Sequence, residues 1–368
     1  MNSVELDIVT ILKGYLNKDY SFSINSNLND IYVLANKLCI TPIIGYTLNK
    51  NDKYVSNIFD KVLFNASLKH EVQKNLRNNI KDIFEDNDID FVFIKGLSLA
   101  KYYDEPYLRY SGDIDVVVKK DKYIFARDVL VENAKFYMKF YLDDEMLLIN
   151  NNGYDVDLHC AFTKIDDAKE EFYKDVVSNN INHELDNELL LFHICNHSAK
   201  HMNAGYISLQ FLIDLYYVNK LEMDRDKVER MFRDAGLWTF YERSLKLIDV
   251  LFFNKEMDEI SRLYVEFLFN GSNVIGRSNK VRVGRAKNND NKFIYLCKRA
   301  FPTYKYMSTQ YRILLKKKYL LPIYYFVRFY DIISTNRIKA ASAEVKYCIT
   351  DNDEDTSLTR KLFNSLGI

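Results

Sequence analysis

The feature that most constrains this chain is an apolar run interrupted by two aspartates, SGDIDVVV at residues 111–118. Ile114 and the valines after it are β-rich and apolar, so the run predicts a strand. Residues two apart on a strand point to the same side, which places the carboxylates of Asp113 and Asp115 side by side. Like charges this close raise each other's pKa unless a cation lies between them. The spacing fits a divalent metal site, and it fits equally well two side chains that face water at a strand end.

A second apolar run, DFVFIK at residues 90–95, ends at Gly96 and precedes a short predicted helix at 97–103. A strand–glycine–helix junction exposes backbone N–H groups, which bind phosphate. Gly96 permits the tight turn, Ser98 adds a hydroxyl and Lys95 adds a cation. Most such junctions are ordinary turns. Followed by the two aspartates on the next strand, this junction predicts a phosphate site beside a carboxylate pair.

A further carboxylate lies in the alternating run YDVDLHC at residues 154–160. Asp155, Asp157 and His159 alternate with apolar residues, which predicts another strand in the same sheet. A third carboxylate can bridge a second metal ion or accept the proton of an attacking hydroxyl. On its own the pattern is more typical of an edge strand with its polar side in water.

The block IKGLSLAKYYDEPYLRYSGDIDVVV at residues 94–118 resembles the nucleotidyltransferase superfamily with the DNA polymerase β-like catalytic fold. More narrowly, it is similar to bacterial nucleotidyltransferases with Lys-Gly, Arg…Gly-Asp-Ile-Asp and Val-Asp-Leu-His motifs. A more distant similarity is to toxin-type nucleotidyltransferases of abortive-infection and toxin–antitoxin systems. Later stretches resemble the helical second half of the family: HICNHSAKH at 193–201, LIDL at 212–215, and the segments around 301–302 and 320–322.

This resemblance implies roles for the matching acidic and turn residues. Asp113 and Asp115 would bind Mg²⁺, or Mn²⁺ in its place, and Asp157 would be the third metal-binding carboxylate. Gly96 and Ser98 would hold the β- and γ-phosphates of a nucleoside triphosphate (NTP).

The resemblance also implies that Lys95 and Arg109 neutralise the triphosphate. The chain departs from the family pattern at two points. Leu97 stands between the glycine and the serine, where the superfamily usually has Gly-Ser or Gly-Gly. The spacer at 99–112 is slightly long, which leaves Tyr110 without an assigned role.

Helical periodicity dominates outside this block, so three regions are predicted: an N-terminal helical region at 1–88, a catalytic core at 89–165 and a C-terminal helical domain at 166–368. Within the core, predicted strands lie at 90–95, 113–118, 136–142, 146–150 and 154–160, with helices at 97–103 and 121–134. The predicted fold class is therefore α+β, a small mixed sheet with helices on one face.

Three histidines, His193, His197 and His201, lie four residues apart on one predicted helix, with Lys200 on nearly the same face. They are compatible with metal ligation, with a structural role, or with a basic lining of the nucleotide cleft. The zincin pattern is absent because no Glu lies between them. The resemblance favours the cleft lining, so Lys200 and either His197 or His201 are predicted to contact phosphate, with His197 as the residue chosen.

Two C-terminal segments are rich in cations. Residues 277–287 carry five cations and no acid. They predict a solvated connector, with contact to tRNA as the alternative. The tail segments at 304–312 and 324–330 mix aromatic residues with cations. They predict buried aromatic stripes, with base stacking as the alternative.

Composition narrows the cellular setting. The chain has 51 Lys and Arg residues and 51 Asp and Glu residues, so no net field favours nucleic acid. Its five cysteines show no CxxC spacing, which predicts free thiols in the cytoplasm and no disulfide. The N-terminus does not resemble a signal peptide, and the apolar stretch at 319–327 is too short to span a bilayer. No membrane partner is expected.

The predicted activity is Mg²⁺-dependent transfer of a nucleoside monophosphate from an NTP such as ATP to an acceptor hydroxyl, with release of pyrophosphate. The acceptor stays open between a small molecule (a sugar, an antibiotic or a peptide) and tRNA, as in the toxin-type enzymes. A catalytically silent nucleotide-binding module is the alternative. Retention of Asp113, Asp115 and Asp157 argues against it.

Overall fold

The computed structural model describes residues 1–51, 53–54, 56–141, 144–163, 168–180, 183–271, 277–335 and 338–368. Backbone proximity groups the chain into two compact units, each described by itself. The first unit comprises residues 1–198 and 208–257, and the second comprises residues 199–207 and 258–368. The predicted region boundaries near residues 88 and 165 both fall inside the first unit and stay predictions.

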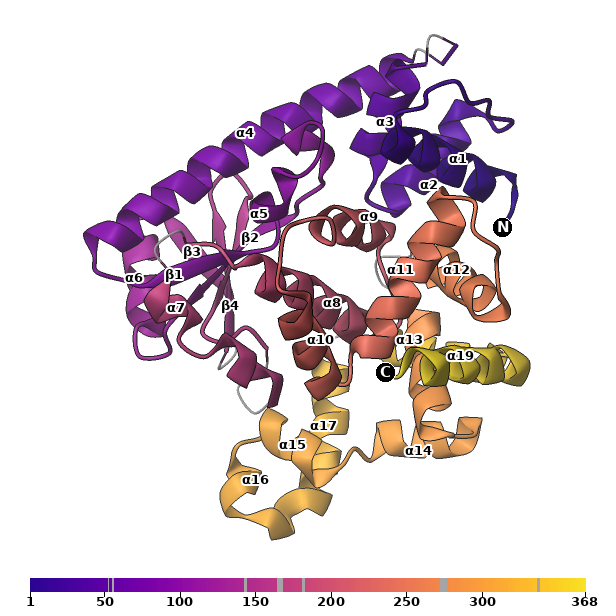
Figure 1. Ribbon diagram of the computed structural model, residues 1–368. Coiled ribbons are helices and arrows are strands. Elements are labelled where there is room, and N and C mark those ends of the chain that lie inside the picture. The colour runs from indigo at the N-terminus through magenta and orange to yellow at the C-terminus, as the bar shows by residue number, and fades with distance from the viewer. Residues whose placement is uncertain are drawn as a thin grey trace. The chain divides into compact units, whose positions relative to one another are not determined.

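Figure 1 shows the sheet of the first unit. It has five strands in the order β1-β2-β5-β4-β3. The strands are β1 (Phe91–Ile94), β2 (Asp113–Val118), β3 (Phe136–Tyr141), β4 (Glu145–Asn150) and β5 (Asp155–His159). β2 and β5 run parallel, and every other neighbouring pair is antiparallel. The predicted mixed sheet and the α+β class are confirmed.

One face of the sheet packs on helices α4 (Asn57–Asp86) and α6 (Tyr123–Ala134). Ile114, Val116 and Val118 of β2 belong to this buried core, together with residues of both helices. Because strand side chains alternate, the residues between them face the other side of the sheet. Helices α4 and α6 therefore cover one face of the sheet, and the polar side chains of β2 and β5 lie on the other face.

The remaining helices of the first unit are α1 (Ser3–Asn17), α2 (Leu28–Lys37), α3 (Thr41–Asn49), α5 (Leu97–Ala100), α7 (Val176–Asn179), α9 (Leu209–Val218), α10 (Arg225–Asp234) and α11 (Trp238–Phe252). Short 3₁₀ turns lie at Pro106–Leu108 and Ala168–Tyr173. Helix α8 (Asn187–Asn203) begins in the first unit and ends in the second.

The second unit is helical in its described residues. Its helices are α12 (Glu259–Gly271), α13 (Arg277–Asn288), α14 (Lys292–Ala300), α15 (Tyr304–Gln310), α16 (Ile313–Lys316), α17 (Leu321–Ser334), α18 (Ile338–Thr350) and α19 (Asp353–Leu366), with a 3₁₀ turn at Lys318–Leu320. Among all the described residues, no helix has the length and apolar character needed to cross a membrane.

The predicted connector at 277–287 is wrong, because these residues form α13. Val281 and Ala286 are buried, and so is Arg285. Arg285 contacts Asp351 at 2.5 Å. A buried arginine is stable when a carboxylate satisfies it. Asp351, the partner of Arg285, lies far from it in the sequence.

The predicted burial of the aromatic tail is also wrong in part. Phe326 and Tyr330 of α17 are 75% and 69% exposed. Helical spacing shows that such residues share one face. It does not show whether the fold supplies a neighbour to cover that face.

Candidate functional site

The parallel pairing of β2 with β5 brings the predicted carboxylates together. Asp113 lies beside Asp155, and Asp115 lies beside Asp157. All four alternate with core residues of the same strands, so they lie on the face opposite α4 and α6. Two acidic strand segments separated by about forty residues thus form one acidic cluster.

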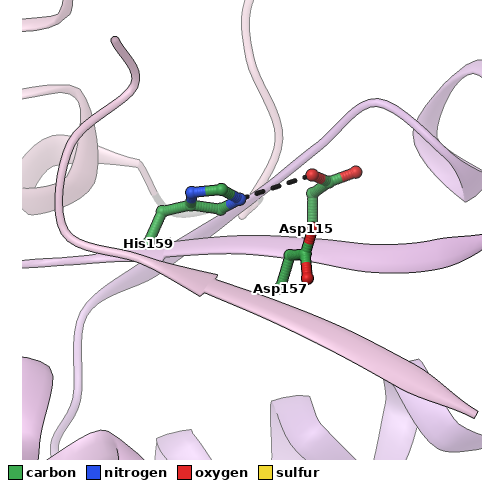
Figure 2. A group of neighbouring side chains, drawn as sticks. All are labelled: Asp115, Asp157 and His159. Atoms are coloured by element: carbon green, nitrogen blue, oxygen red, sulfur yellow. Dashed lines mark hydrogen bonds and ion pairs between the residues drawn. The ribbon is translucent and has the colours of Figure 1, made fainter. Parts of the chain in front are cut away.

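Three potential metal ligands lie at the centre of this cluster. One ligand atom each of Asp115, Asp157 and His159 lies within 4.8 Å of the other two, a grouping that occurs nowhere else in the described ranges. Figure 2 shows the His159 ring pointing toward Asp115, with Asp157 beside them. The Nε2 atom of His159 is 3.4 Å from Oδ1 of Asp115. Asp113, the remaining predicted ligand, is on the same face but outside this group of three.

Lys95 neutralises Asp115 directly. Its Nζ atom is 2.8 Å from Oδ1 of Asp115, and the aspartate is almost fully buried. Burial raises the pKa of Asp115, but attraction to Lys95 and contact with His159 outweigh it and hold that pKa below its usual value. Burial likewise lowers the pKa of Lys95, and attraction to Asp115 reverses the shift. Both groups are therefore charged, and the predicted role of Lys95 toward a triphosphate stays a prediction.

The cluster still holds more negative charge than its cations offset. Burial, followed by repulsion from Asp113 and Asp115, raises the pKa of Asp157 to about 7. Burial and repulsion from Asp115 also raise the pKa of Asp113. In addition, Oδ1 of Asp155 is buried without a hydrogen-bond partner. Crowded carboxylate oxygens of this kind fit a hard divalent cation.

Asp157 also gives the metal-free protein a pH dependence. Its folded-state pKa of about 7 lies above the unfolded value of about 3.9. The stabilisation from its bound proton is complete below about pH 4 and is lost as the pH rises toward 7. In EDTA, we expect Asp157→Asn to raise the unfolding temperature clearly at pH 7.5 and much less at pH 5. Calorimetry at both pH values measures this difference.

The matched control for this experiment is Asp121→Asn, because Asp121 is exposed and precedes α6, away from the acidic cluster. It should shift the unfolding temperature little at either pH. An equal stabilisation by Asp157→Asn at pH 5 and pH 7.5 would show that Asp157 is not protonated in the folded protein.

The Gly96 turn lies next to the acidic cluster. The last residue of β1, Ile94, pairs with Asp115, and the turn follows at once. Gly96 has φ +47° and ψ −119°, a conformation open essentially to glycine alone. A Cβ atom there would lie 3.0 Å from Oγ of Ser111. The backbone N–H of Ser98 donates to the carbonyl of Lys95 at 2.9 Å and closes the turn.

Ser98 is buried next to the Gly96 turn, and its hydroxyl is unsatisfied. Its side chain is 4% exposed, and its Oγ atom has no hydrogen-bond partner. Buried hydroxyls are nearly always satisfied, so an unpartnered one indicates a place for a ligand or water. Helix α5 spans only four residues, so any phosphate here would depend on the turn more than on a helix dipole. The roles of Gly96 and Ser98 in phosphate binding stay predictions.

Arg109 has contacts that its sequence did not reveal. Its Nε and Nη2 atoms each donate to a carboxylate oxygen of Asp214 at 2.9 Å, and Nη1 donates to the Gly96 carbonyl at 3.0 Å. The two side chains are 8% and 7% exposed. The hydroxyl of Tyr103 also donates to Asp214, at 2.6 Å. Arg109 therefore ties the Gly96 turn to α9, and its predicted contact with a triphosphate stays a prediction.

Helix α4 contributes a cation that the sequence analysis did not identify. The Nζ atom of Lys69 is 4.5 Å from the ring centroid of Tyr110. Burial lowers the pKa of Lys69, and attraction to Asp113 opposes that shift. One turn further on, Gln73 donates to the carbonyls of Ser111 and Gly112 at 3.4 Å. Lys69 is one of several lysines on α4, and its sequence neighbourhood does not indicate such a position.

The histidines of α8 do not form a metal cluster within the described residues. His193 is buried, with Nδ1 3.1 Å from the Tyr173 hydroxyl, and its ring centroid is 6.2 Å from that of His197. Lys200 is exposed and belongs to the second unit. The predicted phosphate contacts of His197 and Lys200 stay predictions.

Comparison with known proteins places this geometry in a family. No curated protein matches the chain. A family model described as an uncharacterised nucleotidyltransferase matches residues 25–253, more than half of the 368 residues. The matched part includes the whole sheet, the Gly96 turn and the Arg109–Asp214 pair. The chain therefore belongs to this family of uncharacterised nucleotidyltransferases.

Proposed function

We propose that this protein is a Mg²⁺-dependent nucleotidyltransferase that moves a nucleoside monophosphate from an NTP to an acceptor hydroxyl and releases pyrophosphate. The observation that supports this most strongly is the carboxylate cluster of β2 and β5 beside the Gly96 turn. The family membership supports the same class of reaction.

Asp113, Asp115 and Asp157 would hold the metal ion, with Mn²⁺ as a substitute for Mg²⁺. Their oxygens are the donors that these ions prefer, and the excess negative charge of the cluster favours a cation. When bound, the ion supplies Lewis-acid charge stabilisation for the phosphates. His159 contacts Asp115, so it orients that carboxylate.

The chain's own groups supply the rest of the chemistry. Asp157 accepts the proton of the acceptor hydroxyl at a carboxylate oxygen. The backbone N–H groups of the Gly96 turn and Oγ of Ser98 bind phosphate oxygens. Arg109 holds the Gly96 carbonyl and so keeps the turn in place. Positioning and charge neutralisation account for most of the acceleration in phosphoryl transfer, so few groups are needed.

The acceptor is a small molecule or tRNA, and ATP is the first donor to test. The 277–287 segment gives the tRNA proposal less support than its sequence suggested, because Arg282 and Arg285 both bind Asp351. All five cysteines are free thiols, which agrees with the reducing cytoplasm as the proposed location.

A transfer assay tests the proposal. The protein is incubated with Mg²⁺ and each α-labelled NTP, together with either total RNA or a small-molecule extract. Pyrophosphate release and label transfer are expected with at least one NTP. Both should require Mg²⁺ and should be absent in the triple variant Asp113→Asn, Asp115→Asn, Asp157→Asn. Equal turnover by the triple variant would refute the assignment. Mg²⁺–NTP binding without turnover would instead favour the silent nucleotide-binding module.

A further inference from the structure

A pocket in the first unit is lined by residues of α4 and β1, and the proposed reaction does not use it. Its volume is about 400 Å³. It is walled by α4, β1, α5 and the segment at 183–184. We call it the α4 pocket and define it by Lys74, Arg77, Lys81, Phe93, Lys101 and Glu184.

Basic side chains of α4 form a row along this pocket. His70, Lys74, Arg77 and Lys81 follow at intervals of four, three and four residues, so they share one helix face. With a rise of 1.5 Å per residue, the row is about 16 Å long. The adjacent face of the same helix packs on the sheet through Ile80, which holds the row in position at the pocket.

Two of the cations in the pocket share a single carboxylate. Arg77 contacts Glu184 at 2.8 Å, and Lys101 contacts the other oxygen of the same residue. Contact with Lys101 and Arg77 outweighs burial and keeps the pKa of Glu184 below its usual value. Glu184 is therefore ionised, and it offsets only one of these two charges.

The other two cations are held weakly. Lys74 reaches Glu71 at 4.0 Å and Lys81 reaches Glu85 at 3.7 Å, and neither glutamate lines the pocket. These are exposed pairs, which are worth roughly 0–1 kcal/mol and yield readily to a ligand. The described lining thus carries four permanent positive charges and one negative charge, which favours an anion.

Apolar residues also line the pocket. Phe93, Leu97, Ala100 and Pro106 contribute to the lining. The Arg77 guanidinium lies 4.5 Å from the centroid of the Phe93 ring, so it adds a flat cationic surface. Bases stack on arginine and aromatic faces while cations bind the phosphates. Phe93 and Ala100 are themselves buried, so a base would stack on the Arg77 guanidinium beside Leu97 and Pro106.

We propose that the α4 pocket binds a nucleotide unit, with its phosphate on the basic row and its base against the Arg77 guanidinium and the neighbouring apolar residues. The unit arrives as a free nucleotide or within single-stranded RNA, and a row longer than one phosphate favours RNA. The site is separate from the carboxylates. Its occupancy does not depend on the proposed transfer reaction.

Binding without metal tests this proposal. The probes are a fluorescein-labelled single-stranded RNA of about eight nucleotides and a fluorescent ATP analogue, both followed by anisotropy in EDTA. The variant is Lys74→Glu with Lys81→Glu. The control is Lys61→Glu with Lys139→Glu, which changes the same charge at exposed positions outside the pocket.

We expect the pocket variant to lose about tenfold or more in affinity, and the control to lose less than about twofold, because only the former removes phosphate contacts. The slope of log affinity against log salt should fall by about 1.4, since each lost contact on a single strand contributes about 0.7. Equal unfolding temperatures show that both variants are folded. If the pocket variant does not fold, Lys74→Gln with Lys81→Gln replaces it.

The two probes separate the sources of the ligand. Tight RNA binding with weak nucleotide binding, both lost in the pocket variant, identifies RNA. Nucleotide binding alone, lost in the same variant, identifies a free nucleotide. Equal losses in the pocket and control variants, or no binding of either probe by the wild type, would overturn the proposal. Transfer is not measured in this experiment, so an inactive but RNA-binding protein would refute the proposed function and leave this site standing.

Discussion

Nucleotidyl transfer by the Asp157→Asn variant is expected to fall by about 10³-fold or more while the protein stays folded. The substitution removes one proposed metal ligand and the proposed proton acceptor together. It also removes a carboxylate whose pKa is raised to about 7 by burial, followed by repulsion from Asp113 and Asp115, so the variant should unfold at a higher temperature than the wild type. Loss of activity therefore cannot be attributed to loss of structure.

Steady-state kinetics with the preferred NTP measure this effect. The decrease should appear in kcat, because the lost groups act on the reacting atoms. The exposed Asp121→Asn variant is the control and should keep wild-type kcat. A kcat for Asp157→Asn within about threefold of wild type would exclude both catalytic roles of this residue.

Asp214→Asn is expected to cost about 3–5 kcal/mol of folding stability, because it leaves the Arg109 guanidinium buried without its counter-charge. Bidentate contact with Asp214 is the only ion pair of Arg109 in the described structure. Urea unfolding measures the loss. The matched comparison is Asp128→Asn, which removes an ion pair of Arg127 that is largely exposed and should cost less than about 1 kcal/mol.

Replacing Arg109, Asp214 and Tyr103 together by apolar residues separates their effect on stability from their effect on the position of the Gly96 turn. Changing Arg109 to Met, Asp214 to Leu and Tyr103 to Phe removes both charges and the hydroxyl of these three residues. Replacing a buried ion pair by apolar residues in this way is often neutral for stability. The nucleotidyl-transfer activity of this variant should be low, because the Gly96 carbonyl lacks the donor that Arg109 supplies in the wild type. Recovery of both stability and full activity would show that Arg109 has no positioning role.

The sheet could be predicted because its information is local. Each strand is a short run with its own periodicity, and the aspartates of β2 and β5 take their common face from alternation alone. His159 follows the same alternation, so its place beside Asp115 was readable in principle. The turn at Gly96 was likewise marked by a single residue type.

What could not be predicted depends on partners far along the chain. Asp214 lies 105 residues after Arg109, and no periodicity links them. The basic segment that forms α13 looked solvated because its acids, such as Asp351, lie more than sixty residues later. Phe326 and Tyr330 of α17 are predicted to be buried, but they are exposed. Their spacing predicts that they share one helix face, and it does not predict whether another element packs on that face.

The adjacency of β2 and β5 has a consequence for synthesis. Parallel neighbours need a long crossover, and here α6 and the β3–β4 hairpin are made between them. The ribosome must therefore release residues through His159 before the carboxylates can meet. A nascent or truncated chain that ends after β2 contains the Gly96 turn and the first aspartate pair, yet it cannot assemble the acidic cluster. Termination between β2 and β5 thus leaves a fragment without the acidic cluster.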